Sequence, residues 1–255
     1  MSRVLKVEIP GRAGSLLSGI LHRPDSEPSA TVVMTHCFTC SKDYKVLAWT
    51  ARSLAKKGLA VLRYDLTGLG ESDGNFIDTT LSTDLEDLRS VCRWLQEEGL
   101  PPNALVGHSM GGMISILAAP SVDSVRTVAV LASSSELDRF TRLLNPDHWS
   151  ELETTGATTV DVMGRSYALG RERMEDLRRY SILEEAARLK DRFLVVHGGD
   201  DKVVPIAEGM RLFEAAPFPK AFYTVAGADH LFSRRAHSEE AARILEVWIK
   251  GAEND

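Results

Sequence analysis

The 255-residue sequence has no long hydrophobic run, no excess of positive charge and only three cysteines. No apolar stretch approaches the ~18 residues needed to span a bilayer, so we expect no transmembrane segment. The formal net charge of -6 argues against nucleic acid or an anionic membrane as a main partner. Residues 1–8 alternate like a strand and lack the apolar core of a signal peptide. Three cysteines do not make a disulfide framework, so the cytoplasm is the expected location.

The overall composition is that of an ordinary globular protein, with 44% hydrophobic and 26% charged residues. A chain of this length can bury one large core, and α/β folds of this size are often single domains. The sequence shows no internal repeat or low-complexity tract. We therefore expect one domain over residues 1–255.

Strand-like and helix-like segments alternate along most of the chain. Short apolar segments predict strands, most clearly at residues 31–35, 59–64, 103–106, 125–131, 193–196 and 221–225. Apolar residues at helical spacing predict helices between them, most clearly at residues 44–57, 81–95 and 241–249. This alternation predicts an α/β fold with a mostly parallel central sheet of about eight strands and helices on both faces. Such sheets bind ligands beyond the carboxyl ends of their strands.

The alternation pauses over residues 133–180, which are polar and mixed. Within this stretch, residues 158–162 and 166–169 predict a hairpin, and a charged helix is expected at about 171–180. We expect this segment, about 134–180, to form a small cap insertion over the strand ends. Because substrate identity would be determined there, the sequence leaves the substrate open.

Residues 107–111 read Gly-His-Ser-Met-Gly and carry the pattern G-x-S-x-G. The pattern is short and common by chance, and the plain alternative is a loop serine. Here it follows a predicted strand and precedes a predicted helix, which favours a sharp, strained turn that exposes Ser109. The helix N-terminus behind the serine also favours negative charge. We therefore predict that Ser109 is a nucleophile.

A serine nucleophile needs a base, which is usually a histidine oriented by a carboxylate. Of the seven histidines, His230 lies in the loop after the last predicted strand, where the order serine, acid, histidine places the base. The acid should follow the strand at 193–196, where Asp200 and Asp201 are adjacent. Spacing within that loop favours Asp201. His197 lies at the end of the same strand and is interpreted as structural.

The developing oxyanion requires preorganised hydrogen-bond donors. One donor should be the backbone amide of Met110, the residue after the nucleophile. The loop after residues 31–35 should supply the other, for which we expect the amide of Phe38. Both donors belong to the backbone, so the side chains carry little information about them.

Two other features of the sequence compete with this interpretation. Cys37 and Cys40 form a C-x-x-C, which can be a thiol-redox site or half of a metal site. There is no second such pair, and Cys92 lies on the apolar stripe of a predicted helix, so tetrahedral zinc would lack ligands unless histidines were recruited. Gly68, Gly70 and Gly74 follow Asp65 without a Gly-Lys-Ser/Thr sequence, and they predict a tight structural turn rather than a phosphate loop.

Taken in order, these motifs resemble those of the α/β-hydrolase superfamily over nearly the whole chain. The motifs are His36-Cys37-Phe38, Asp65 with residues 68–72, residues 107–111, residues 197–205, and residues 227–230. The chain resembles small bacterial esterases of the acyl-peptidase or feruloyl-esterase type. Residues 36–43 look most like hydrolase domains that are often fused to an OsmC-like domain, although we expect no such second domain here. Cys37 departs from the pattern, since many relatives have glycine there.

The resemblance implies a catalytic triad of Ser109, His230 and Asp201, with Phe38 and Met110 as oxyanion donors. It implies a serine hydrolase that cleaves a small acyl ester through an acyl-enzyme, with a thioesterase or peptidase less favoured. No cofactor or metal is expected. The expected partner is the small-molecule ester, without nucleic acid or membrane, and a homodimer is left open. The alternatives are a thiol-redox module built on Cys37 and Cys40, and a binding protein that has lost turnover.

Overall fold

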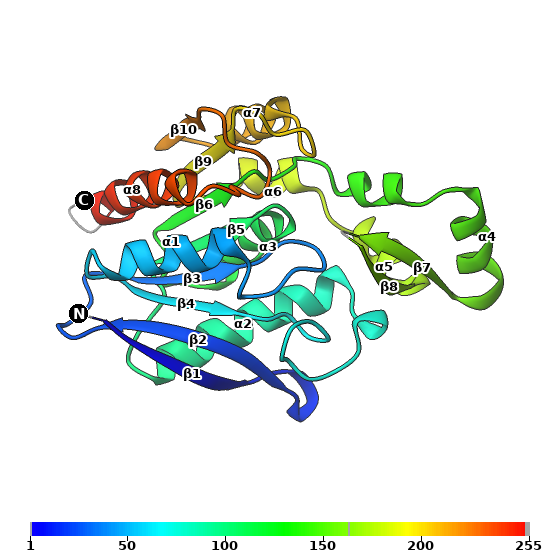
Figure 1. The fold of residues 1–255 in the computed structure, drawn as a ribbon, viewed down its shortest axis with the longest axis horizontal. Coiled ribbons are helices and arrows are strands. Elements are labelled where there is room, and N and C mark those ends of the chain that lie inside the picture. The colour runs from blue at the N-terminus through cyan, green and yellow to red at the C-terminus, as the bar shows by residue number, and fades with distance from the viewer. Residues whose placement is uncertain (1, 163, 253–255) are drawn as a thin grey trace.

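The computed structural model describes residues 2–162 and 164–252, and its main sheet has eight strands in the order β1-β2-β4-β3-β5-β6-β9-β10 (Figure 1). The strands are β1 (Ser2–Pro10), β2 (Leu16–Pro24), β3 (Thr31–Thr35), β4 (Ala60–Tyr64), β5 (Ala104–His108), β6 (Thr127–Leu131), β9 (Arg192–Gly198) and β10 (Lys220–Val225). Strand β2 is antiparallel to both of its neighbours, and every neighbouring pair from β4 to β10 is parallel. The predicted α/β fold with about eight mostly parallel strands is confirmed.

The central strands are apolar on both faces because helices cover both sides of the sheet. Successive residues of a strand point to opposite faces, so Val33 and Leu105 pack into one core cluster while Val32 and Val106 pack into the other. Helices α2 (Leu81–Glu97), α3 (Met110–Ala118), α6 (Ile182–Ala187) and α7 (Ile206–Ala215) contribute to the first cluster. Helices α1 (Lys45–Ala55) and α8 (Arg235–Gly251) contribute to the second, and Figure 1 shows them side by side.

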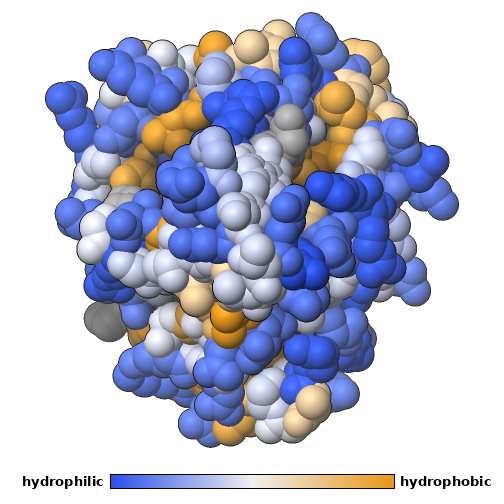
Figure 2. All heavy atoms as spheres, turned by 90° about the vertical axis from the view of Figure 1, so that its right-hand side faces the viewer, coloured by the Kyte–Doolittle hydropathy of each residue, from blue (hydrophilic) through white to orange (hydrophobic). Residues whose placement is uncertain are grey.

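The segment between β6 and α6 projects beyond one end of the sheet (Figure 1). It contains a 3₁₀ segment η4 (Leu137–Leu143), helix α4 (Pro146–Thr155), the hairpin of β7 (Ala157–Val162) with β8 (Arg165–Gly170), and helix α5 (Arg171–Leu177). The hairpin was predicted, but the helix expected at about 171–180 ends at Leu177 because Ser181 caps the next helix by accepting a hydrogen bond from the Glu184 amide. Figure 2 shows this end of the molecule as largely hydrophilic, with separate hydrophobic patches.

A buried ion pair ties this segment to the core. Arg173 of α5 is 2% exposed, and its Nη1 lies 3.0 Å from Oδ2 of Asp84 in α2. Its Nε donates to the carbonyl of Thr79 at 3.1 Å, and its guanidinium lies 4.9 Å from the centre of the Phe76 ring. Removing one partner of such a pair would leave an uncompensated buried charge, so the segment is firmly anchored.

None of the helices within the described residues has both the length and the apolar character required to cross a bilayer. The longest, α2 and α8, are amphipathic and pack one side on the sheet. In α2, Thr80 and Thr83 form a capping box at the N-terminus, and Gly99 follows the helix with a left-handed φ of 72°. These signals place the helix close to the predicted range of 81–95.

Candidate active site

Ser109 occupies a strained turn between β5 and α3. Its φ of 53° and ψ of -116° are rare for a residue with a side chain and are typical of functional turns. A Cβ at Gly107 would overlap the carbonyl of Gly111, and a Cβ at Gly111 would overlap the carbonyl of Thr35. The two glycines of the motif are therefore required because the neighbouring backbones approach so closely.

The structure brings His230 and Asp201 together. Nδ1 of His230 lies 2.8 Å from Oδ2 of Asp201. The other carboxylate oxygen of Asp201 accepts hydrogen bonds from the amides of Val203 at 2.8 Å and Val204 at 2.9 Å. Asp200 lies exposed on the same turn. Since the carboxylate engages Nδ1, Nε2 is the ring nitrogen of His230 that is left for a substrate or a nucleophile.

The environment of Asp201 keeps its carboxylate charged. Burial alone would raise the pKa of Asp201, but hydrogen bonds from His197 and His230 outweigh it and hold the pKa well below its usual value. His197 is fully buried, with Nε2 2.9 Å from the Val204 carbonyl and 3.5 Å from Oδ2 of Asp201. The sequence predicted only a structural role for His197. Its position four residues before Asp201 was the sequence signal that could have indicated its contact with this carboxylate.

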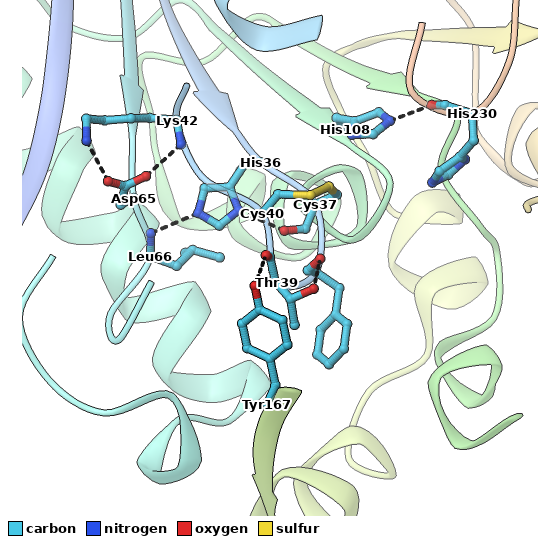
Figure 3. The surroundings of a disulfide bond; sticks show 11 residues. His36, Cys37, Thr39, Cys40, Lys42, Asp65, Leu66, His108, Tyr167 and His230 are labelled. Atoms are coloured by element: carbon cyan, nitrogen blue, oxygen red, sulfur yellow. Dashed lines mark hydrogen bonds and ion pairs between the residues drawn. A yellow bond between two sulfur atoms is a disulfide. The ribbon is translucent and has the colours of Figure 1, made fainter. Parts of the chain in front are cut away.

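A second buried histidine holds the loop of His230 from behind. Nε2 of His108 lies 2.8 Å from the backbone carbonyl of His230, so it acts as the donor (Figure 3). Burial, together with the nearby His230, lowers the pKa of His108 to about 3, so the ring is neutral at ordinary pH. Its Nδ1 has no hydrogen-bond partner among the described residues. His108 therefore positions the His230 backbone without carrying charge.

The loop after β3 forms the opposite wall of the site (Figure 3). The ring of His36 fixes its start, with Nδ1 2.8 Å from the Cys37 carbonyl and Nε2 accepting from the Leu66 amide at 3.1 Å. Thr39 at the apex has a left-handed φ of 57°, and the hydroxyl of Tyr167 in β8 donates to its carbonyl at 2.9 Å. Phe38 lies between these supports and lines the same pocket as Ser109.

Cys37 and Cys40 form a disulfide in this loop, a pairing that was not expected from the sequence. The amide of Cys40 donates to the carbonyl of Cys37 at 3.2 Å, and this turn brings their Cα atoms to 5.3 Å, within disulfide range. The cysteines were expected to form no disulfide framework, and the bond between Cys37 and Cys40 corrects that expectation. Cys92 is free and buried, and no cluster of three or more His, Cys, Asp or Glu suited to a metal occurs among the described residues.

A buried charge network anchors the far end of the loop. Asp65 accepts hydrogen bonds from the backbone amide of Lys42 and from its Nζ, each at 2.6 Å, and Nζ also lies 2.8 Å from Oε2 of Glu71. Burial alone would lower the pKa of Lys42, but the hydrogen bonds to Asp65 and Glu71 outweigh it and raise the pKa. The predicted turn requires glycine next to this network, because a Cβ at Gly70 would overlap the Asp65 carboxylate.

The other expected oxyanion donor, the amide of Met110, lies at the start of α3. Met110 is the first residue of that helix, so its amide has no acceptor within the helix and is available to a ligand. The hydroxyl of Ser133 donates to the carbonyl of Ser109 at 2.8 Å and helps to fix the turn. A pocket of about 400 Å³ runs beside these groups, and Ser109, His230, Phe38, Met113, Val162 and Leu231 are among its lining residues.

Comparisons with solved structures agree with this fold. The esterase domain of a Rhodothermus marinus protein is 32% identical, covers 98% of both chains and gives a TM-score of 0.81. Est1E from Butyrivibrio proteoclasticus, solved with ferulic acid bound, is 21% identical, covers 97% of this chain and 99% of its own, and gives a TM-score of 0.83. At that lower identity, the second likeness speaks for the fold alone.

Comparisons of sequence assign the family. The mouse palmitoyl-protein thioesterase ABHD10, mitochondrial, is 22% identical over 168 residues, or 64% of this chain and 55% of its own. An uncharacterized 31.7 kDa protein of Escherichia coli is 24% identical over 86% of this chain and 90% of its own. The model of the alpha/beta hydrolase family matches residues 32–244, more than four fifths of the chain. The protein is therefore a hydrolase that belongs to the alpha/beta hydrolase family.

Proposed function

We propose that this protein is a serine esterase that hydrolyses small carboxylic esters through Ser109, His230 and Asp201. The observation that carries the proposal is the 2.8 Å contact between His230 and Asp201, in a pocket that His230 shares with Ser109. The strained backbone of Ser109 adds support because such strain is rarely kept without a use. A pure binding protein would have no need of all three groups.

The chemistry follows from the placement of each group. Oγ of Ser109 attacks the ester carbonyl while Nε2 of His230 accepts the hydroxyl proton. Asp201 holds the imidazole in the required tautomer and stabilises its positive charge. The amides of Met110 and Phe38 donate to the oxyanion that forms. The intermediate then expels the alcohol, which takes the proton from His230, and the acyl group remains on Ser109.

Water completes the reaction by the same route. His230 accepts a proton from water as the water attacks the acyl-enzyme, and the second tetrahedral intermediate releases the acid and restores Ser109. Carboxylic esters are the first choice because an esterase domain is the relative with 32% identity. Thioesters are the second choice, since a thioesterase is among the sequence relatives. Both substrates pass through the same acyl-enzyme.

Covalent labelling tests the nucleophile directly. A fluorophosphonate should add once to the wild-type protein, and the Ser109→Ala variant should remain unlabelled by intact-mass spectrometry. Hydrolysis of a panel of acyl esters and thioesters should fall on the order of 10⁶-fold in the same variant, as in other triads. Equal labelling of the two proteins would show that Ser109 is not the nucleophile.

A further inference from the structure

Two arginines of η4, Arg139 and Arg142, line the pocket that holds Ser109 and His230. The rest of the lining is largely apolar, and none of the described lining residues is Asp or Glu. The wall of the pocket is therefore positively charged in a chain whose net charge is -6. Apolar surroundings screen a charge less than water does, so these arginines influence what binds beside the serine.

The two arginines differ in whether a carboxylate of the protein pairs with them. Nη2 of Arg142 lies 3.2 Å from Oε2 of Glu136, so an internal carboxylate faces it. Nη2 of Arg139 donates instead to the neutral carbonyl of Val203 at 2.9 Å. No carboxylate of the described residues lies within ion-pair distance of Arg139. A guanidinium has five N–H donors, so most of those on Arg139 remain for a ligand.

The contacts of Arg139 also place it near the reacting groups. It is bonded to the carbonyl of Val203, and the amide of Val203 donates at 2.8 Å to Asp201, the partner of His230. The guanidinium is thus held on the wall next to the acid–histidine pair. A small ester with its carbonyl at Ser109 fills much of a 400 Å³ pocket and brings its other end against such a wall.

We propose that Arg139 binds a carboxylate carried by the substrate, so that this enzyme prefers esters with a negative charge close to the scissile bond. The planar guanidinium matches a carboxylate with two parallel hydrogen bonds, which a neutral ester cannot offer. The inference rests on the proposed esterase function and narrows its substrate class. The plainer alternative is that Arg139 only ties η4 to the loop of Val203.

Matched pairs of esters separate these roles. Monomethyl succinate against methyl butyrate tests a carboxylate on the acyl side, and 4-butyryloxybenzoate against phenyl butyrate tests one on the alcohol side. For one of the pairs, kcat/KM of the wild type should favour the charged ester by at least about tenfold, as expected for hydrogen bonds between charged groups. Arg139→Gln should abolish that preference by lowering kcat/KM for the charged ester, while Arg139→Lys should keep part of it.

Arg243→Gln provides the matched control because it removes an exposed arginine of α8, outside the pocket lining, and should keep the preference. An equal loss for charged and neutral esters in Arg139→Gln would identify the arginine as a structural tie and overturn the inference. A wild type with no preference in either pair would overturn it as well.

A binding measurement makes the test independent of turnover. Calorimetric titration of Ser109→Ala with the charged ester should give a Kd at least about tenfold lower than in the double variant with Arg139→Gln. Equal affinities would overturn the inference, whatever the rates. If the wild type hydrolyses none of the esters although this difference in affinity is present, the proposed function fails and the carboxylate site stands.

Discussion

Ser109 and the loop of Phe38 face the same pocket, but different forces hold them in place. On the serine side, Gly107 and Gly111 let backbones pack so closely that no side chain fits between them. On the loop side, the buried pair of Lys42 and Asp65 fixes one end, and Tyr167 fixes the apex. One side thus depends mainly on steric fit, which does not change with pH. The other depends on charge and hydrogen bonds, which do.

The largest effect of a conservative substitution is expected on the serine side, at Asp201. In Asp201→Asn the amide can still accept from Val203 and Val204, but it presents an N–H group to His230 and reverses the tautomer. Turnover should fall on the order of 10⁴-fold, as when the orienting carboxylate of other triads is replaced. The neighbouring Asp200→Asn is the control and should retain most of the activity. Steady-state kcat for a neutral ester measures both, and the opposite ranking would reassign the acid.

The next effect concerns the loop side, at Lys42. Lys42→Met removes the charge that compensates Asp65 and frees the end of the loop, so the Phe38 amide is no longer held. The free energy of unfolding should fall by about 3–5 kcal/mol. The value of kcat should fall about 10²-fold, comparable to the loss of one oxyanion donor. Urea unfolding and ester kinetics measure the two quantities.

Two further variants distinguish the effect of the charge of Lys42 from the effect of its packing. Lys45→Met changes an exposed lysine three residues later and should have little effect on either quantity. Adding Asp65→Asn to Lys42→Met removes the uncompensated charge and should restore part of the stability. If the double variant is no more stable than Lys42→Met, the loop is held by the shape of the lysine side chain rather than by its charge.

Acid should affect the loop side more than the serine side, because two buried histidines with a lowered pKa support the loop and one supports the serine side. Behind the loop, burial and the nearby Arg63 lower the pKa of His22 to about 4, and burial also lowers the pKa of His36. On the serine side, the pKa of His108 is lowered to about 3. A histidine with a lowered folded pKa stabilises fully above ~6.5, and its contribution is lost as the pH falls from there toward the folded value.

The size of this pH effect can be measured at one histidine. Between pH 7.5 and pH 5, His22 and His108 should each remove about 2 kcal/mol from the free energy of unfolding. His22→Gln keeps an acceptor for Nε of Arg63, which lies 3.3 Å from the ring nitrogen, but it cannot be protonated. Urea unfolding at the two pH values should show a loss about 2 kcal/mol smaller in this variant. An unchanged loss would mean that folding does not lower the pKa of His22.

The serine side could be predicted from the sequence because its signals are local. Ser109 and its two glycines fall within five residues, and Asp201 and His230 each follow a recognisable strand. The periodic patterns of strands and helices predict the sheet for the same reason, since each pattern reports burial of its own segment. In the structure, His230 contacts Asp201 rather than Asp200, as the loop spacing favours.

The contacts that hold the loop side and the segment between β6 and α6 could not be predicted, because their partners are charged and far apart in the sequence. Lys42 binds Asp65 from 23 residues away, and Arg173 binds Asp84 from 89 residues away. Composition alone places such residues at the surface, because charged side chains are rarely buried unless they are paired. The position of Arg139 could not be predicted for another reason: it lies in a short 3₁₀ segment without a periodic pattern. Only the folded chain brings these groups together.

The smallest effect is expected from the disulfide between Cys37 and Cys40, even though it lies in the wall of the pocket. His36 and Lys42 hold the two ends of the loop without it, and Tyr167 holds the apex (Figure 3). The double change Cys37→Ala, Cys40→Ala should therefore alter ester hydrolysis less than about tenfold, because the Phe38 amide is still presented.

A thiol-redox function would give the reverse pattern in the same variants. The wild type would then reduce a peroxide or a disulfide at the expense of an added dithiol, and the double cysteine variant would not. Ser109→Ala would leave that reduction unchanged, because the serine takes no part in thiol exchange. Reduction that depends on the cysteines, together with no hydrolysis of any ester, would replace the esterase proposal. Ester hydrolysis that survives the double variant but not Ser109→Ala would leave the disulfide as one of several supports of the loop.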